Sequence, residues 1–226
     1  MTTVNVACIQ LNSRPDIDEN LKQAGQLIRD AAKDGAEFIA TPENTDFMRE
    51  TSKSSLAMAL SAEEHPGIPF FSYLAKELKV WLLIGSMKIK VSETKVVNRS
   101  FLFTDTGQLK ATYDKIHLFD VTLPNGEEYL ESAITEAGTK AVVSGTPWRK
   151  LGMSVCYDVR FPHLYRTMAQ KGAEMMSIPA AFTASTGEAH WEVLLRARAI
   201  ETGSFVIAPA QCGEHEGGRK TYGHSM

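Results

Sequence analysis

The feature that most constrains the fold is a regular alternation of short, strongly apolar segments with segments whose apolar residues recur at helical spacing. Residues 3–11 (TVNVACIQL) are mostly apolar, which predicts a buried central strand. Residues 16–34 follow with the apolar spacing of an amphipathic helix. A strand followed at once by a helix indicates an α/β domain in which helices cover the faces of sheets.

The same alternation continues along the chain. Gly35 is expected to end the first helix as a left-handed cap, and Pro42 is expected to end a short strand just before Glu43. Glu43 should therefore lie at the carboxyl end of a strand. The other expected elements are strands at residues 37–40, 80–90, 96–104, 109–113, 150–155, 175–178 and 205–211, helices at residues 163–171 and 189–202, and a long functional loop at residues 120–140.

A short internal repeat accompanies this pattern. Residues 32–42 contain an Ala-x-x-Gly-Ala-Glu segment followed by a proline, and residues 169–179 contain the same arrangement. Each copy indicates a helix end, a glycine cap, a short strand and a proline stop. The repeat favours two α/β halves of similar design, whereas the alternative is that Gly-Ala is simply a common way for a helix to end.

Composition and charge limit the class of protein. The 226 residues, of which 43% are hydrophobic and 23% charged, are expected to form one domain over residues 1–226 with a sizeable core. A formal net charge of -3 provides no basic surface for a nucleic acid. The sequence contains no apolar run long enough to span a bilayer and no signal-peptide pattern, so we expect a cytoplasmic protein with neither membrane nor nucleic-acid partners.

The three cysteines differ in their sequence context. Cys8, Cys156 and Cys212 are an odd number at wide spacing, which indicates reduced thiols rather than disulfides or a metal site. Cys156 alone directly follows an expected strand and precedes a turn into a helix. Such a turn exposes a thiol at the sheet edge, near backbone N–H groups that can stabilise an oxyanion. Position alone leaves open that Cys156 is an inert buried residue.

Two charged residues occupy similar positions. Lys115 follows the strand expected at residues 109–113, where a lysine can stabilise negative charge or donate a proton. Glu43 follows the strand expected at residues 37–40. Each residue by itself could equally be a solvated surface charge.

The three segments occur in the order T-P-E-N, Y-D-K-I-H-L-F-D and C-Y-D-V-R-F-P. Together they closely resemble the motifs of the nitrilase superfamily, also called carbon–nitrogen hydrolases, and the resemblance extends from the first expected strand to the last residue. It implies that Glu43, Lys115 and Cys156 form a catalytic triad. It also implies that Glu131, in a Glu-Ser segment followed by Gly138, is an accessory glutamate.

The resemblance implies a cysteine-dependent amidase that forms a thioester acyl-enzyme. In that chemistry Glu43 takes the proton of Cys156, while Lys115 and the backbone N–H of Tyr157 hold the oxyanion. No metal or organic cofactor has a role in this scheme, and the sequence contains neither a glycine-rich phosphate loop nor an H-E-x-x-H pattern.

The segments at residues 182–201 and 210–215 resemble the Nit branch of the superfamily. They imply a small carboxylate-bearing primary amide as substrate, hydrolysed to acid and ammonia, with deaminated glutathione favoured. The alternatives are an ω-amidase acting on α-ketoglutaramate, an N-carbamoyl hydrolase, a nitrilase, or a Nit-like module that acts mainly in protein interaction. Arg160 is the basic residue nearest to Cys156 in sequence, and it either binds the substrate carboxylate or braces the turn; Arg166, Arg196 and Lys220 are further candidates.

The fold implied by the resemblance is a four-layer α-β-β-α sandwich whose subunits pair through helices into a homodimer or a higher homo-oligomer. The sequence departs from the family pattern at its C-terminal end. Chains of this family normally continue past Gly-His-Ser-Met with another strand and a tail, whereas this sequence ends at Met226 and is therefore expected to be short at its C-terminus relative to the family.

Overall fold

The computed structural model describes residues 3–122, 126 and 128–226, which form two main sheets with helices on their outer faces. The first sheet has the order β1-β2-β3-β4-β5. Its first three strands are parallel and the last two are antiparallel to their neighbours. The strands are β1 (Val6–Cys8), β2 (Phe38–Ala40), β3 (Trp81–Lys90), β4 (Val96–Phe103) and β5 (Leu109–Asp114).

Both faces of the first sheet are buried. Ile39 and Leu82 pack into a core beneath the helices of the N-terminal half, whereas Ala40 and Leu83 pack into the core that the two sheets share. Successive residues of a strand point to opposite faces, so each of these strands must be apolar throughout. This explains why the sequence contains continuous apolar runs here rather than a strict alternation with polar residues.

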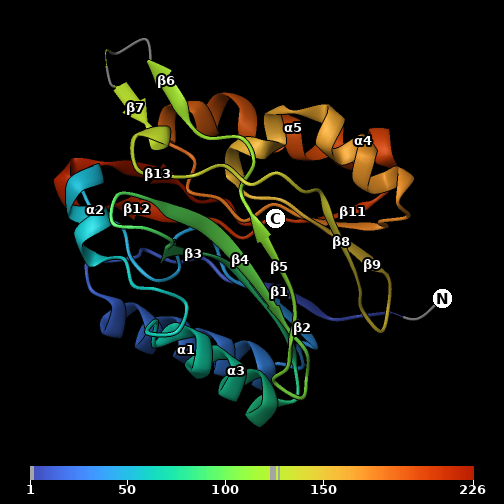
Figure 1. Cartoon of the computed structure of the whole chain (residues 1–226). Coiled ribbons are helices and arrows are strands. Elements are labelled where there is room, and N and C mark those ends of the chain that lie inside the picture. Colours follow the sequence, from blue (N-terminus) through green and yellow to red (C-terminus); the bar gives the residue numbers. More distant parts are fainter. Residues whose placement is uncertain (1–2, 123–125, 127) are drawn as a thin grey trace.

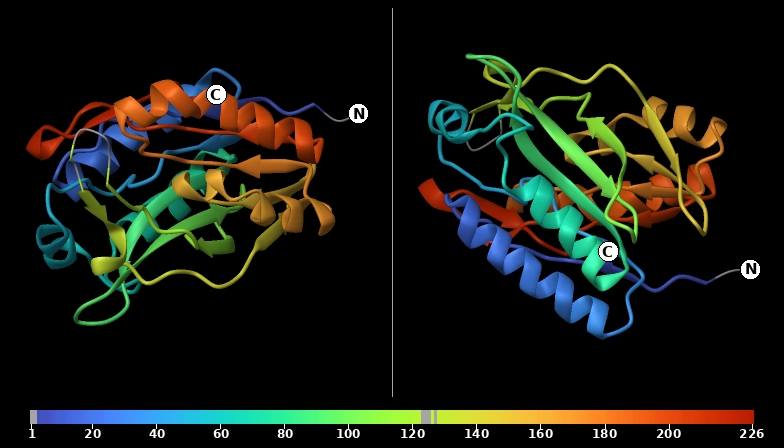
Figure 2. Two further views of the ribbon diagram at one scale, coloured as in Figure 1. Left: turned by 90° about the horizontal axis from the view of Figure 1, so that it is seen from above. Right: turned by 60° about the horizontal axis from the view of Figure 1, so that its bottom comes forward.

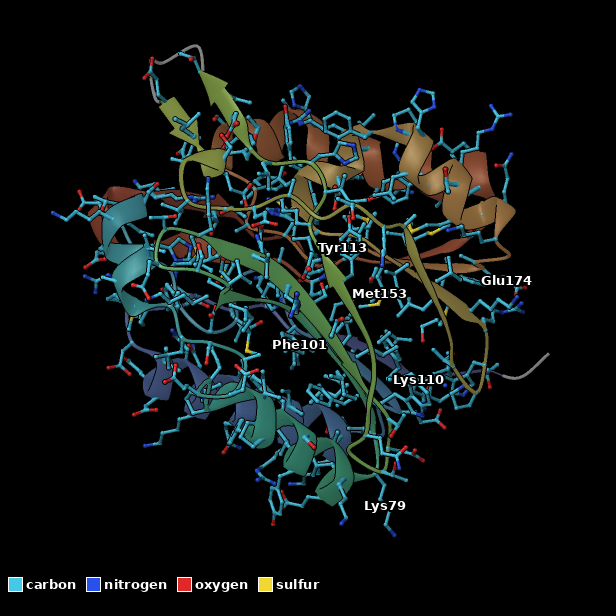
Figure 3. All side chains as sticks on the ribbon, in the orientation of Figure 1. Lys79, Phe101, Lys110, Tyr113, Met153 and Glu174 are labelled. Atoms are coloured by element: carbon cyan, nitrogen blue, oxygen red, sulfur yellow. The ribbon has the colours of Figure 1, made fainter. Side chains whose placement is uncertain are left out.

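The second sheet has the order β11-β10-β9-β8, with β9, β10 and β11 parallel and β8 antiparallel. Tyr113 of β5 and Met153 of β9 meet in the core between the two sheets (Figure 3). The strands are β8 (Val142–Gly145), β9 (Lys150–Met153), β10 (Met175–Ser177) and β11 (Phe205–Ile207).

The helices begin and end at residues suited to those positions. The Asp16 side chain accepts a hydrogen bond of 2.8 Å from the Glu19 N–H at the start of the first helix, and Gly35 beyond its end has φ 91°. At the start of the last helix, the Thr183 side chain accepts a hydrogen bond from the Thr186 N–H. The helices are α1 (Ile17–Lys33), α2 (Ser52–Met58), α3 (Gly67–Leu78), α4 (Pro162–Gln170) and α5 (Ala184–Thr202).

These elements stack as four layers, which confirms the α-β-β-α sandwich (Figure 1). Helices α1 and α3 cover the outer face of the first sheet and lie side by side, as Figure 2 also shows, and α4 and α5 cover the second sheet. The internal repeat corresponds to one structural unit used twice. In both copies a helix ends at a glycine of positive φ, Gly35 or Gly172, and leads into a strand, β2 or β10, that lies between two parallel neighbours.

The expected long loop at residues 120–140 is only partly a loop. Strands β6 (Asp120–Thr122) and β7 (Glu128–Leu130) form an antiparallel pair, followed by a 3-10 turn at Glu131–Ala133. Residues 123–125 and 127 of that segment lie outside the described residues. Each of these strands has only three residues, which is too short to show a periodicity among the surrounding turn residues of the sequence.

Other differences concern short elements and helix starts. The sequence did not indicate α2, β8 or the antiparallel pair β12 (Cys212–Glu214) and β13 (Lys220–Tyr222), all of which are short. The sequence did not indicate helix α3 either. This helix contains Gly67 and Pro69 in its first turn, where these residues are tolerated although they disfavour a helix interior. Helix α5 begins at Ala184 rather than at residue 189, because the Thr183 cap compensates for the weak helix formers that follow. None of the helices in the described part of the chain is long and apolar enough to cross a membrane.

The two halves approach closely at Gly85 of β3. A Cβ added there would lie 2.0 Å from the Thr41 oxygen, 2.5 Å from the Pro42 oxygen and 2.5 Å from the Pro179 Cβ. Gly85→Ala should therefore force the ends of β2 and β10 apart and lower the free energy of unfolding by about 1–3 kcal/mol. Denaturant unfolding measures this loss. Gly145→Ala is the matched control, because nothing lies within 4 Å of a Cβ at Gly145; equal losses in the two variants would contradict the close approach.

Candidate active site

Glu43 directly follows Pro42 and lies just past the carboxyl end of β2, where the sequence predicted it. Its carboxylate is almost fully buried, at 4% exposure for the residue. Oε1 accepts hydrogen bonds of 2.9 Å from Lys115 Nζ and from Asn98 Nδ2, and Oε2 accepts one of 2.9 Å from the Ala181 N–H. Both oxygens are thus held in place by donors from three separate segments.

Lys115 follows directly on β5, and its side chain is 2% exposed. Nζ donates to Glu43 and, at 2.8 Å, to Oε2 of Glu131. Burial opposes the charge of the ammonium, but the two carboxylates outweigh it and raise the pKa of Lys115 well above its ordinary value. Lys115 is therefore a fixed cation and not a proton donor near neutral pH.

Cys156 begins a 3-10 turn, Cys156–Arg160, between β9 and α4. Its φ of 51° is in the left-handed region, which is strained for a residue with a side chain. Its N–H donates to the Pro179 oxygen at 2.8 Å, and its thiol forms a hydrogen bond with Glu43. The sharp turn expected from the sequence is present, and it directs the sulfur at the carboxylate.

The protonation states of this pair follow from their surroundings. Burial by itself would raise the pKa of Glu43, but the adjacent Lys115 and the hydrogen bonds from Lys115 and Cys156 lower it to about 2. Burial and the charge of Glu43 raise the pKa of Cys156 well above its ordinary value, although Lys115 opposes them. The resting pair is thus a carboxylate beside a neutral thiol, which is the arrangement of a general base and a nucleophile before proton transfer.

Asp158 holds the turn that carries Cys156. This fully buried carboxylate accepts hydrogen bonds from the Val155 N–H at 2.9 Å and from the Tyr113 hydroxyl at 2.7 Å. It also accepts from the His117 backbone N–H at 3.0 Å and contacts His117 Nδ1 at 2.7 Å. Because Tyr113 and His117 flank Lys115 in sequence, one buried side chain fixes the turn of the thiol relative to the segment of the lysine.

The structure brings together Glu43, Lys115, Cys156 and Glu131, whose Oε2 also accepts from the Phe119 N–H at 2.7 Å. Arg160 behaves differently. It contacts His190 Nδ1 at 3.2 Å and lies over the rings of Tyr157 and Phe182, in keeping with the bracing alternative, and it is not among the residues that line the cavity described below.

A cavity of about 510 Å³ opens over Cys156. Its wall includes the Glu43, Lys115, Glu131 and Tyr157 side chains. Much of the remaining wall comes from the segment before α2 and from α2 itself, from β7, from the segment before α5 and from the segment between β12 and β13. In the described ranges, no group of three or more His, Cys, Asp or Glu side chains could hold a metal ion.

Several wall and support residues were not singled out from the sequence. Asn98 bridges the two glutamates, and a polar residue within the buried strand β4 was a usable signal for it. Gln211 is fully buried after β11 and donates to the backbone oxygen of Glu43 at 2.9 Å. Lys88 and Arg219, which also line the cavity, had no local sequence pattern that distinguishes them from surface charges.

Comparison with protein families matches residues 5–226 to the carbon-nitrogen hydrolase family. A protein of Synechocystis sp. (strain PCC 6803 / GT-S) named deaminated glutathione amidase is 44% identical over 225 residues, which cover 97% of this chain and 82% of that protein. A Homo sapiens protein of the same name is 42% identical over 229 residues, with 98% of this chain and 69% of that protein covered.

Solved structures agree with these sequence matches. The Caenorhabditis elegans NitFhit protein superposes with a TM-score of 0.89 at 36% identity over 100% of this chain, which spans 56% of that protein. Saccharomyces cerevisiae Nit3, described as a member of branch 10 of the nitrilase superfamily, superposes with a TM-score of 0.87 at 30% identity, covering 99% of this chain and 81% of Nit3. The chain therefore belongs to the carbon–nitrogen hydrolase family, in the Nit branch of the nitrilase superfamily, and is an amidase that hydrolyses carbon–nitrogen bonds.

Proposed function

We propose that this amidase uses Cys156 as its nucleophile and acts on a carboxylate-bearing amide, with deaminated glutathione favoured over other substrates. The observation that carries the proposal is the buried contact between the Cys156 thiol and the Glu43 carboxylate, with Lys115 bound to the same carboxylate. The substrate is suggested by relatives at 41–44% identity that are named deaminated glutathione amidase.

In the first half-reaction, Glu43 accepts the thiol proton as the sulfur attacks the amide carbon and a C–S bond forms. The developing oxyanion lies beside the Lys115 ammonium and the N–H of Tyr157, which is near the start of the 3-10 turn. When the C–N bond breaks, the proton held by Glu43 passes to the leaving nitrogen. The products are a free amine and a thioester on Cys156.

In the second half-reaction, Glu43 accepts a proton from a water molecule whose oxygen attacks the thioester carbon. The C–S bond breaks, the carboxylic acid leaves, and the proton returns to the thiolate. Glu131 contacts Lys115 and Asn98 rather than Cys156, so we assign it the role of positioning the lysine and maintaining its charge.

The chemistry of the favoured substrate corrects one expectation. Deaminated glutathione is glutathione with a keto group in place of its α-amino group, so its cleaved bond is a secondary amide to cysteinylglycine and not a primary amide. The amine released from it is that dipeptide rather than ammonia. A primary 2-oxo amide such as α-ketoglutaramate carries the same acyl half and would release ammonia. Both compounds pass through the same acyl-enzyme.

We also propose that subunits pair through the outer face of α5, which would cover the large apolar side chains of Val193 and Ile200, now 68% and 81% exposed. The three cysteines are free, which suits a reducing compartment such as the cytoplasm.

The substrate proposal is tested by steady-state kinetics on deaminated glutathione, α-ketoglutaramate, a carbamoyl amine and a simple nitrile. We expect turnover of the two 2-oxo amides, and loss of turnover in Cys156→Ala because the nucleophile is absent. Cys8→Ala and Cys212→Ala are the matched controls and should retain activity. Turnover of only the carbamoyl amine or the nitrile would refute the substrate, activity in Cys156→Ala would refute the nucleophile, and no turnover at all would favour an interaction role.

The pH profile tests the role of Glu43. Because its pKa is lowered to about 2 from an ordinary 4.5, the carboxylate stays ionised as pH falls through the usual range of a glutamate, and kcat/KM should remain level from neutral pH down to about pH 4.5. Glu43→Gln should reduce kcat by about 10²–10⁴-fold, since general base catalysis is lost. Glu19→Gln on the exposed surface of α1 is the control. A limb centred between pH 5 and 7 in the wild-type profile, as roughly expected for a base of raised pKa, would argue against this assignment.

The pairing proposal predicts a change of mass in solution. Val193→Glu combined with Ile200→Glu places two charges where the proposed interface is apolar and should convert dimers into monomers. Sedimentation equilibrium measures the mass directly, and Tyr73→Glu, at the exposed side chain of α3, is the control. A wild-type protein that is monomeric at micromolar concentration would end the proposal.

A further inference from the structure

Two cationic side chains in the cavity wall have no role in the mechanism above. Lys88 lies on β3 and Arg219 directly precedes β13, and both line the cavity beside Glu43. In the part of the chain that the structure describes, neither forms an ion pair with a carboxylate, whereas Lys115 forms two. A cation that faces a cavity without a carboxylate partner needs another explanation.

The Lys88 side chain is bound to the residue that follows Glu43 in the sequence. Its Nζ donates to Oδ1 of Asn44, the residue after Glu43, and it also lies 5.2 Å from the centre of the Phe47 ring. The nearest acid, Asp46, uses Oδ2 to accept the Lys88 backbone N–H at 2.8 Å. Burial lowers the pKa of Lys88, and Asp46 and Glu43 only partly oppose it. An anion beside Nζ would stabilise the charged form.

Arg219 is linked to the same glutamate through Ala181. Its Nη2 donates at 2.9 Å to the oxygen of Ala181, whose N–H binds Glu43, and the guanidinium lies 5.3 Å from the centre of the Tyr129 ring. Its Nε is buried and lacks a hydrogen-bond partner. A buried donor on a charged group is costly when unpaired, so this atom is available to a ligand.

Three of the acids that line the cavity already have cationic partners. Glu43 and Glu131 share Lys115, and Glu216 lies 3.3 Å from Arg49. Glu50 and Glu128 line the cavity as well. The positive charge of Arg219 contributes to lowering the pKa of Lys88, so the two cations repel each other. An incoming carboxylate would relieve that repulsion and supply oxygens to both cations.

We propose that Lys88 and Arg219 form a carboxylate-binding subsite that holds the carboxylate on the acyl half of the substrate. The inference deepens the proposed function and rests on it. The acyl half is favoured over the leaving group because both cations are attached to residues in contact with the reaction centre, Asn44 and Ala181. A short chain of methylene and keto carbons separates that carboxylate from the amide carbon, whereas the leaving-group carboxylate lies much farther along the dipeptide.

Kinetics on charged and neutral substrates test the subsite. In Arg219→Gln and in Lys88→Met, KM for a 2-oxo dicarboxylic acid monoamide should rise by about 10- to 100-fold, because a charged hydrogen bond to the carboxylate is lost. The rate with the corresponding neutral methyl ester of that amide should change by less than about threefold. Arg219→Lys should recover part of the loss. Arg29→Gln, in the exposed pair of α1 with Glu77, is the matched control and should behave as the wild type.

These comparisons separate the possible failures. A fall in rate that is equal for the charged and the neutral substrate would overturn the subsite and leave the cysteine chemistry intact. α-Ketoglutaramate has only the acyl-half carboxylate. If the variants raise KM for deaminated glutathione but not for α-ketoglutaramate, the two cations do not bind the carboxylate of the acyl half.

Binding of the product gives a measurement that does not depend on turnover. Calorimetry of 2-oxoglutarate with Cys156→Ala should detect binding, and adding Arg219→Gln or Lys88→Met to that variant should weaken it by about tenfold or more. Equal affinity in the single and double variants would overturn the subsite. If no amide is hydrolysed but the substitution of Arg219 or Lys88 weakens the binding of 2-oxoglutarate, the proposed function fails and the anion site remains.

Discussion

The site depends on one buried cation, Lys115, placed between the buried carboxylate of Glu43 and the partly buried carboxylate of Glu131. Taking Lys115, Glu43 and Glu131 out of water costs several kcal/mol per ion, and only close contact with hydrogen bonding compensates for that cost. Contacts of 2.8 and 2.9 Å to Lys115 provide it, and Asn98 donates to both glutamates. Removal of Lys115 would leave both carboxylates without their cation. The cluster therefore constrains β2, β4, β5 and the 3-10 turn after β7 to a single arrangement.

The thiol is coupled to this cluster through the backbone of the other half of the chain. Glu43 belongs to the first sheet, whereas Cys156 and the Ala181 N–H belong to segments that follow β9 and β10 of the second. The Cys156 N–H donates to the Pro179 oxygen, and the Pro179 side chain lies so close to Gly85 of β3 that a Cβ added at Gly85 would be 2.5 Å from the Pro179 Cβ. Close packing across the sandwich thus fixes the position of Cys156 relative to Glu43.

The proposed reacting groups and much of the cavity wall come from different parts of the fold. The proposed reacting side chains follow strand ends and are fixed by buried hydrogen bonds, whereas much of the cavity wall comes from α2, β7 and the segment between β12 and β13. Such segments vary without disturbing the sheets. This separation is consistent with one set of reacting groups serving related amidases of different substrate preference, because the wall and not the sulfur contacts the rest of the substrate.

Local sequence determined the elements with long apolar patterns and the turns with special residues. Helix α1 with its Asp16 cap, the glycine exits before β2 and β10, the proline stop before Glu43 and the sharp turn at Cys156 all follow from neighbouring residues. The ordered motifs also predicted which charged residues meet. Short segments without an apolar period, such as α2, β8 and β12–β13, were not predicted, because their stability comes from contacts with distant parts of the chain.

Only the tertiary structure decided which charges became functional candidates and which became supports. Arg160 is near Cys156 in sequence but lies against His190, Tyr157 and Phe182, whereas Lys88 and Arg219 are distant in sequence and line the cavity. Sequence determines a residue's chemistry and its local backbone. Burial, the identity of the ion-pair partner and the resulting pKa arise where separate segments converge, and that convergence is set by the packing of the two sheets.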